Sequence, residues 1–440
     1  MKKSIYNSVH LFDTQKVLYN AFTDKMCILD LVVADLYEKH EPSELKSIHP
    51  SFYEYLQEQQ FILQEDTDEV CQLIETWQQN DTDATTFTLT VNPTLNCNMH
   101  CWYCYEHHQG NLNMNEDVFN RLLKFISSKT AEPQLKSFSL GLFGGEPLLN
   151  FNTVGRKLIE HCRVKCEEND CHFSMSCVTN GSLLSDDIIE FLSAIKCHVA
   201  FQITMDGNEP MHNSIRQLNN EKGSYFLILQ NCVKLLHHDT FSVVLRCNFT
   251  RQNLLSFLDV AYDLSQIMER QGGDSSHLII DLHQIWQDVK ANDSVKEDIQ
   301  EQERSVREAF QSKGFNVTAE KPVKRYRCYA DRNNHALVNY DGNIFRCTAR
   351  DFVSENAEGV LTPNGQIIWN AKSNIRDSIK WANVTCRQCR LYPICGGNCS
   401  QYKLEQGGSA GCYFGYSEEK KTTILRKRIE WMLNRTHPKP

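Results

Sequence analysis

Three closely spaced cysteines in the first quarter of the chain are the residues best suited to chemistry. They occur in the segment Cys97-Asn-Met-His-Cys101-Trp-Tyr-Cys104. Three thiolates on one short loop can hold three corners of an iron–sulfur cube, because cysteine is the usual ligand of such clusters. The fourth iron then lacks a protein ligand and can bind a small molecule. The alternative is a zinc ion, with His100 or His107 completing the ligand set.

A second cysteine group lies near the C-terminal end. Its spacing is Cys328-x13-Gly342-x4-Cys347, then Cys386-x2-Cys389-x5-Cys395-x3-Cys399, and then Cys412. CxxC pairs are typical of metal sites, so one or two zinc ribbons are an alternative here too. The chain has 19 cysteines and begins without the apolar segment of a secretory signal. We therefore expect a cytoplasmic location, where thiols bind metal more often than they form disulfides.

Alternating strand and helix patterns surround the first cysteine group. Strands are expected at residues 85–91, 137–143, 172–179, 198–205, 242–249 and 277–283, and helices at residues 115–128, 151–168, 185–195, 223–237, 252–270 and 293–312. This alternation indicates βαβ units in an α/β fold, and six such units indicate a partial barrel. Functional residues of parallel barrels collect at the C-terminal ends of strands. The first cysteine group directly follows the first strand.

The two flanks of this region have different patterns. In the first 82 residues, a hairpin is expected over residues 11–22 and helical spacing over residues 27–40 and 43–61, followed by a polar linker. After residue 325 we expect a hairpin around the turn YDGN and a charged helix over residues 417–435.

The segment CNMHCWYC resembles the CxxxCxxC signature of the radical SAM superfamily. The resemblance continues at the later strand ends, where GGEP, TNG and TMDG resemble family motifs and Arg216 matches a common arginine. The resemblance implies that Cys97, Cys101 and Cys104 hold a [4Fe-4S] cluster and that S-adenosyl-L-methionine binds its open iron. The residues that it implies for contact with S-adenosyl-L-methionine are Tyr103, Gly144, Gly145, Glu146, Thr179, Asn180, Thr204 and Arg246. Glu146 is expected to receive the methionine ammonium.

The C-terminal cysteines resemble the seven-cysteine SPASM pattern, which implies two auxiliary [4Fe-4S] clusters and therefore three clusters in all. Auxiliary cluster I would use Cys328, Cys347 and Cys399, and auxiliary cluster II would use Cys386, Cys389, Cys395 and Cys412. The first set is one ligand short, because residues 329–346 contain no cysteine. Its open iron could bind a substrate thiolate, or water in a cluster that only transfers electrons.

The resemblance also implies the domain order. We expect an N-terminal winged-helix-like recognition domain (1–82), a radical SAM partial barrel (83–290), a bridging helix and linker (291–325) and an Fe–S-rich SPASM domain (326–440). The N-terminal region resembles that of maturases of ribosomally made peptides (RiPPs), where such a domain takes a leader peptide as an added strand. The alternative is a packing cap on the barrel.

Two related families compete for the reaction. RiPP maturases install oxidative crosslinks in a precursor peptide, and a thioether is slightly favoured over a C–C or C–O bond. Anaerobic sulfatase maturases form formylglycine and place Asp after the second SPASM cysteine, where this chain has Thr348. The alternative hypothesis, from another functional class, is a zinc-bearing binding protein without catalytic activity. Candidate catalytic residues at the strand ends are Asp206, Asp281 and His283.

The amino-acid composition limits the classes of partner that the chain is expected to bind. The net charge is −9 and no long basic block is present, so nucleic-acid binding gets no electrostatic support. The longest apolar runs are too short for a membrane span. The resemblance implies a reduced flavodoxin or ferredoxin as electron donor. The remaining cysteines, among them Cys162, Cys166 and Cys171, are expected to be structural.

Overall fold

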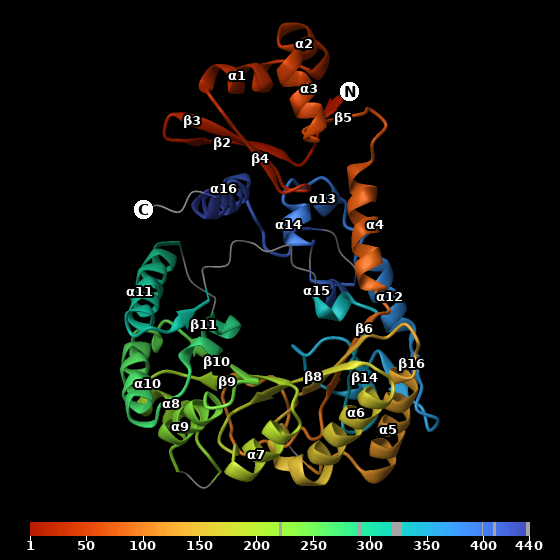
Figure 1. The fold of residues 1–440 in the computed structure, drawn as a ribbon, viewed down its shortest axis with the longest axis vertical. Helices are drawn as coiled ribbons and strands as arrows, with labels where there is room; N and C mark the ends of the chain where they lie inside the picture. Colours follow the sequence, from red (N-terminus) through yellow and green to blue (C-terminus); the bar gives the residue numbers. More distant parts are fainter. Residues whose placement is uncertain are drawn as a thin grey trace. The chain divides into compact units, whose positions relative to one another are not determined.

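The structure, a computed structural model, describes residues 1–108, 110–219, 222–288, 293–318, 328–397, 399–407 and 411–436. They form two compact units (Figure 1). The first unit comprises Met1–Asp83, Ala319–Asn333 and Ser373–Pro440, and the second comprises Ala84–Thr318 and Asn334–Lys372. The expected domain bounds differ, because the N-terminal region groups with most of the C-terminal region.

A long curved sheet organises the second unit (Figure 1). Its strands are β6 (Thr86–Val91), β7 (Ser137–Leu142), β8 (His172–Thr179), β9 (His198–Met205), β10 (Phe241–Phe249), β11 (Leu278–Gln284), β12 (Asn316–Val317), β13 (His335–Val338), β14 (Asn343–Phe345), β15 (Gly359–Leu361) and β16 (Ile367–Trp369). Their order is β12-β11-β10-β9-β8-β7-β6-β13-β14-β15-β16. Strands β6 to β11 are the six expected strands and pair in parallel in chain order. The α/β class is therefore confirmed, and the hairpin around YDGN is β13–β14.

Helices cover one face of this sheet (Figure 1). They are α5 (Glu116–Thr130), α6 (Arg156–Glu168), α7 (Asp186–Ala194), α8 (Glu209–Ile215), α9 (Tyr225–Leu235), α10 (Phe257–Gln271) and α11 (Asp293–Ser312). Short helical turns are η1 (Pro147–Asn150), η2 (Phe151–Gly155), η3 (Leu254–Ser256), η4 (Ser275–His277), η5 (Trp286–Asp288) and η7 (Ser354–Asn356). Asn115 and Ser185 cap α5 and α7 by accepting backbone N–H bonds.

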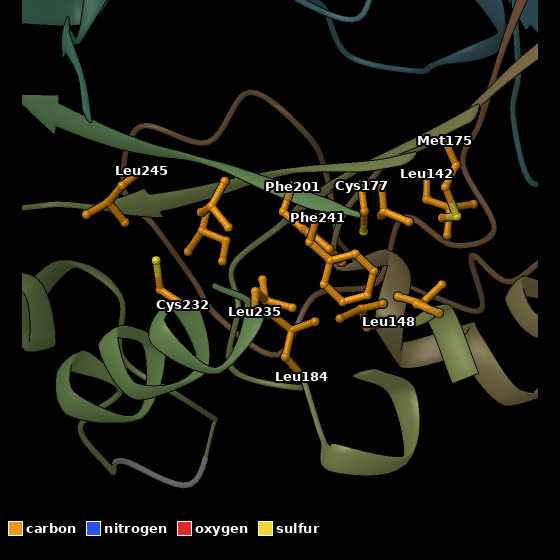
Figure 2. Close-up of a cluster of buried hydrophobic side chains, with 14 of the residues drawn as sticks. Leu142, Leu148, Met175, Cys177, Leu184, Phe201, Cys232, Leu235, Phe241 and Leu245 are labelled. Atoms are coloured by element: carbon orange, nitrogen blue, oxygen red, sulfur yellow. The ribbon is translucent and has the colours of Figure 1, made fainter. Parts of the chain in front are cut away.

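The sheet face toward the helices is apolar. Figure 2 shows Phe201, Phe241 and Leu245 from the strands close to Cys232 and Leu235 of α9. The expectation that isolated cysteines serve as small hydrophobic residues holds at Cys162, Cys166, Cys171, Cys177, Cys197, Cys232 and Cys247, which are all buried in this core.

The opposite sheet face is polar and only partly buried. In β8, buried Phe173, Met175 and Cys177 alternate with partly exposed Ser174 and Ser176. Strand β10 has the same alternation. Parallel sheets usually carry apolar residues on both faces because helices cover both. The polar alternation therefore leaves this face available to ligands.

The first unit begins with a three-stranded antiparallel sheet and helices. Its elements are β1 (Lys2–Lys3), β2 (Asn7–Phe12), β3 (Gln15–Asn20), β4 (Lys25–Leu29), α1 (Leu31–Lys39), α2 (Pro42–Ile48), α3 (Pro50–Glu58), β5 (Ile62–Leu63) and α4 (Glu69–Asp81), and then η6 (Tyr329–Asp331), α12 (Ala371–Ile379), α13 (Val384–Arg387), α14 (Tyr392–Cys395), α15 (Ser400–Glu405) and α16 (Glu418–Thr436). The expected hairpin is β2–β3, with Asp13 at positive φ in its turn.

Three local expectations in this unit were wrong. The helical pattern over residues 27–40 begins as strand β4, because Cys27 and Ile28 pair with β3. The pattern over residues 43–61 is two helices, since Pro50 starts a new one after the extended residue His49. The expected linker contains α4, whose N-cap Asp68 accepts from the Cys71 backbone N–H.

Aromatic packing joins distant segments of the first unit. The Trp77 ring of α4 stacks on Trp381 at 5.6 Å between centroids and meets Tyr392 edge-on at 4.9 Å. In α16, Arg428 donates to the Tyr19 hydroxyl at 2.8 Å and pairs with Asp24. N-terminal and C-terminal segments therefore share one core. Among the described helices, none has the length and apolarity to cross a membrane.

Candidate functional site

The first cysteine group lies on a loop that follows β6. The Thr94 hydroxyl accepts the Asn96 backbone N–H at 3.0 Å and so fixes the start of the loop. Backbone N–H groups of the next strand end then reach the same loop: Gly145 donates to the Thr94 carbonyl at 3.3 Å and Glu146 to the Asn96 carbonyl at 2.9 Å. The GGEP segment after β7 is therefore a backbone support for the cysteine loop.

Glycine is required at two positions of this support. Gly144 has φ +104°, which side chains rarely adopt. At Gly145 a Cβ atom would lie 2.4 Å from the carbonyl oxygens of both Leu95 and Asn96. The two backbones can meet only because both side chains are absent.

Glu146 lies fully buried beneath the loop. Its carboxylate accepts hydrogen bonds from the Thr179 hydroxyl at 2.8 Å, from the Asn180 backbone N–H at 2.7 Å and from the Leu148 backbone N–H at 3.1 Å. Burial raises the pKa of Glu146 to about 7. The carboxylate thus ties the ends of β7 and β8 together, and its expected contact with an ammonium group stays a prediction.

The Asn180 side chain continues this support to the cysteine loop. Its amide nitrogen donates to Asn98 Oδ1 at 2.7 Å, and the Asn98 amide donates to the Ser182 hydroxyl at 3.0 Å. Asn98 lies between Cys97 and Cys101 in the sequence. The TNG segment after β8 therefore holds the loop between its first two cysteines.

Tyr103 joins a buried polar network at the end of β9. Its hydroxyl donates to the Asp206 carboxylate, with oxygens at 2.8 and 2.9 Å, and accepts from Arg216 at 2.6 Å and Asn248 at 3.2 Å. Arg216 also donates to Asp206 directly. Asp206 is fully buried and Arg216 nearly so. This arrangement anchors the loop between Cys101 and Cys104 to the ends of β9 and β10 and to the C-terminal end of α8.

Further residues fix the turn that carries Asp206. The Asp206 backbone N–H donates to His212 Nδ1 at 3.3 Å, and the Asn253 amide donates to the Asp206 carbonyl at 3.0 Å. His212 Nε2 lies 3.0 Å from the Ser224 hydroxyl. The sequence analysis named Arg216 only as a motif residue and did not name Asn98, His212, Asn248 or Asn253. Asn98 and Asn253 give no local signal, because their partners Asn180 and Asp206 are 82 and 47 residues away.

The three thiols share one electrostatic environment. Burial raises the pKa of Cys97 to about 12 and that of Cys104 to about 11, and it also raises the pKa of Cys101. The Arg216 guanidinium acts in the opposite direction on all three. A buried cation beside three thiols fits a group that binds them as thiolates.

The thiols are not gathered around a single ion. Among the described residues, no three His, Cys, Asp or Glu side chains lie close enough to ligate one metal ion. Ligands of a cube lie farther apart than ligands of one ion, because each binds a different iron. The cluster expected at the three-cysteine loop stays a prediction.

A polar row crosses the partly buried sheet face next to this network. Arg246 in β10 is in register with Thr204 in β9 and Asp281 in β11. Arg246 donates to Asn248 at 3.2 Å, and Asp281 accepts from the Thr318 hydroxyl at 3.1 Å. His283 follows on β11, opposite Asn248. The structure thus brings the expected Thr204 and Arg246 together with two of the three catalytic candidates, whereas Asp206 is enclosed by Arg216 and Tyr103.

The second cysteine group is divided between the units. Cys386, Cys389, Cys395 and Cys412 all belong to the first unit. Burial raises the pKa of Cys395 to about 12, and the neighbouring thiols Cys386, Cys412 and Cys389 raise it further. The set expected for auxiliary cluster II stays a prediction.

The other three cysteines belong to different units. Cys328 and Cys399 are in the first unit and Cys347 is in the second. The set expected for auxiliary cluster I stays a prediction.

Comparisons with known proteins place these features in a family. The family described as "4Fe-4S single cluster domain" matches residues 88–224. The chain is 25% identical over 337 residues to the radical SAM cyclopropyl synthase TigE of Paramaledivibacter caminithermalis, covering 69% of this chain and 65% of that protein. It is 27% identical over 157 residues to a cysteine-type anaerobic sulfatase-maturating enzyme of Clostridium novyi, covering 34% of this chain and 40% of that protein. The matches span less than two-thirds of either relative.

Two solved structures share the fold. The structure of anSMEcpe with bound AdoMet and the Kp18Cys peptide has a TM-score of 0.58 at 16% identity, over 79% of this chain and 98% of that one. SuiB of Streptococcus suis, bound to its precursor peptide SuiA, has a TM-score of 0.52 at 14% identity, over 94% of this chain and 99% of that one. The chain is therefore similar in sequence to radical SAM proteins, among them a cyclopropyl synthase and a sulfatase-maturating enzyme, and it shares the fold of the solved structures of anSMEcpe and SuiB.

Proposed function

We propose that the chain is a radical SAM oxidoreductase that installs an oxidative crosslink in a ribosomally made precursor peptide. The observation that carries the proposal is the cysteine loop after β6, supported by GGEP after β7 and by the buried Asp206–Arg216 pair after β9. When bound, the cluster and S-adenosyl-L-methionine supply a 5′-deoxyadenosyl radical that removes a hydrogen atom from the substrate.

The chain's own residues position these groups. Cys97, Cys101 and Cys104 would hold the cluster, and Arg216 would offset its negative charge from a buried position. The polar row of Thr204 and Arg246 on the partly buried sheet face offers a hydroxyl and a guanidinium to S-adenosyl-L-methionine. Enclosure by Tyr103 and Asp206 keeps the loop rigid, which favours one geometry of the reacting atoms.

Two auxiliary clusters complete the proposed cofactor set. Four thiols of the first unit would hold one cluster, and Cys328, Cys347 and Cys399 would hold the other. The gathering of Cys386, Cys389 and Cys412 around Cys395 supports the four-ligand set. An auxiliary cluster would accept the electron that oxidation of the peptide releases, and a reduced flavodoxin or ferredoxin would supply electrons to the protein.

A peptide substrate is supported by the fold shared with SuiB in complex with SuiA. The small sheet β2-β3-β4 ends in the edge strands β2 and β4, and an extended leader peptide can pair with such an edge. Exposed Ile28 in β4 adds an apolar contact at that edge. We propose that the leader of the precursor peptide binds here.

The bond formed has two candidates. A thioether is favoured by the three-cysteine set, because the open iron of such a cluster can bind a substrate thiolate. A carbon–carbon bond is favoured by the similarity to TigE, whose name describes a cyclopropyl synthase.

A second candidate function is formylglycine formation on a sulfatase. The match to the Clostridium novyi sulfatase-maturating enzyme favours it. Thr348 after Cys347 disfavours it, since the resemblance places Asp there in sulfatase maturases.

Anaerobic reconstitution and co-expression test the proposal together. We expect about 12 iron atoms per chain, four for each cluster, and reductive cleavage of S-adenosylmethionine. A peptide encoded beside the gene should lose the mass of two hydrogen atoms per site, and its fragmentation should fail inside a ring. Formylglycine without a ring would favour the second candidate. Stoichiometric zinc with four or fewer irons would refute both.

A further inference from the structure

The loop after the first cysteine group is hydrogen-bonded to the loop that follows Cys347. The Tyr105 hydroxyl donates to the Thr348 carbonyl at 2.6 Å. The His107 backbone N–H donates to Asp351 Oδ1 at 3.4 Å, and His107 Nδ1 lies 2.5 Å from Asp351 Oδ2. All four residues belong to the second unit. One carboxylate thus holds both the backbone and the ring of His107.

The carboxylate fixes the protonation pattern of the imidazole. Because a carboxylate oxygen only accepts hydrogen bonds, Nδ1 of His107 carries the proton. In the neutral imidazole, Nε2 then has a free lone pair. The His107 side chain is 80% exposed while that of Asp351 is 20% exposed. An oriented, accessible imidazole of this kind is the usual arrangement of a general base.

The pair lies near both expected redox centres. His107 is three residues from Cys104, so their Cα atoms are at most about 11 Å apart. Asp351 is four residues from Cys347, which limits that separation to about 14 Å. Cys104 follows the C-terminal end of β6, where barrel substrates bind.

Two of the earlier catalytic candidates, and the neighbouring Glu106, are less exposed than His107. Asp206 is enclosed by Tyr103 and Arg216. Asp281 accepts from Thr318 and is in register with Arg246. Glu106, next to His107 in the chain, is buried and away from solvent.

We propose that His107, oriented by Asp351, accepts the proton that the substrate loses during the proposed oxidation. The inference rests on the proposed function. A C–H bond and an X–H bond of the peptide would break, where X is S, C or O, and a C–X bond would form. One electron from the reduced cluster of the cysteine loop would cleave the C5′–S bond of S-adenosylmethionine and release methionine, and the 5′-deoxyadenosyl group would take one hydrogen atom from the peptide. The electron left on the peptide would reduce an oxidised auxiliary [4Fe-4S] cluster, and one proton would pass to His107 Nε2. Asp351 is a positioning residue.

The test compares the reconstituted full chain with His107→Ala, His107→Gln and Asp351→Asn. Formation of modified peptide should fall about 100-fold in both His107 variants, the size of a general-base contribution. Iron content and cleavage of S-adenosylmethionine should persist, so that 5′-deoxyadenosine accumulates without product. Imidazole added to His107→Ala should restore product. Asp351→Asn should lower the rate less and gain nothing from imidazole. The matched control is His172→Ala, an exposed histidine at the opposite end of β8.

Each outcome bears on one claim. Unchanged product formation in both His107 variants at full iron content would overturn the inference and leave the proposed function standing. Loss of iron in both would also overturn it, because His107 would then be structural. Absence of any modified peptide with the unaltered protein would refute the proposed function, and the inference would fall with it.

Discussion

Arg216 and Asp206 hold opposite charges away from water beside the cysteine loop. Taking one charge out of such a pair leaves the other buried without compensation, which is more costly than any surface change. The Tyr103 hydroxyl is hydrogen-bonded to both Asp206 and Arg216, so the rigid charge pair also holds the loop between Cys101 and Cys104. The charge pair is therefore a structural condition for the cluster site.

Replacement of Asp206 tests this role. Asp206→Ala should lower the free energy of unfolding by about 3–5 kcal/mol, because Arg216 stays buried without its carboxylate. The measurement is urea-induced unfolding under anaerobic conditions. Glu190→Ala on the exposed face of α7 should change the value by less than about 0.5 kcal/mol. An equally small change in the free energy of unfolding in both variants would contradict the claim that the buried charge pair stabilises the fold.

Glu146 gives the site a pH dependence of known sign. Burial raises its pKa from 4.5 to about 7, so the folded state keeps a proton that the unfolded state has lost between these values. Stability from this group is therefore present at low pH and lost as pH rises toward about 7.

Glu146→Gln should remove this titration while keeping an acceptor oxygen. The thermal midpoint of the unaltered protein should fall more between pH of about 5 and about 7.5 than that of the variant. Glu301→Gln, on the exposed face of α11, should leave the fall of the thermal midpoint with pH as large as in the unaltered protein. If Glu146→Gln also left this fall unchanged, another titrating group would be its cause.

Single residues could be predicted from sequence where type and spacing coincide. The cysteine loop, both glycines of GGEP and Thr179–Asn180 lie at strand ends, as expected. The Tyr103–Asp206 contact spans 103 residues and the His107–Asp351 contact spans 244. No local pattern encodes such pairs, because they depend on which strand ends become neighbours.

At the scale of elements, the site depends on close approach of two backbones. The strand end after β7 donates two backbone hydrogen bonds to the cysteine loop after β6. This contact is possible because β6 and β7 are parallel neighbours and their C-terminal ends coincide.

A methyl group at Gly145 should separate these backbones. Gly145→Ala places Cβ 2.4 Å from two carbonyl oxygens, so the cysteine loop must shift. We expect a loss of about four irons per chain, measured after anaerobic reconstitution. Gly141→Ala, in β7 itself, meets the Ser176 hydroxyl at 3.3 Å and should keep its iron. Full iron in Gly145→Ala would contradict the support role.

Element prediction succeeded where periodicity and pairing agree. All six barrel strands and the helices between them appear close to their expected bounds. The strands and helices pack against each other, so the apolar residues recur with the period of a strand or of a helix. It failed at α4 and at β4. In α4 most polar residues face solvent, and the few buried positions include the charged Glu69 and Asp81 beside Leu73, Ile74 and Trp77. In β4 a tertiary partner, β3, overrides the helical spacing.

At the scale of the whole chain, Arg428 ties the C-terminal helix to the N-terminal sheet region. Its guanidinium contacts both Tyr19 and Asp24 from α16. The sequence reading expected two separate domains here, since composition cannot reveal that segments far apart in sequence share a core.

Arg428→Ala should loosen the N-terminal region. We expect the free energy of unfolding to fall by about 1–3 kcal/mol, because Arg428 is buried but Asp24 is partly exposed. Limited proteolysis should then cleave faster within residues 1–83. Lys427→Ala, on the exposed side of the same helix, is the control. Equal cleavage rates in both variants would refute the link.

The shared core also sets an order of events during translation. Trp77 and Tyr19 are synthesised about 300 to 400 residues before their partners Trp381, Tyr392 and Arg428. At 5–20 residues per second, the interval is roughly 15 to 80 s. During that time the nascent first unit presents an unfinished aromatic surface, so its folding waits for these partner residues while β6 to β11 can already pair.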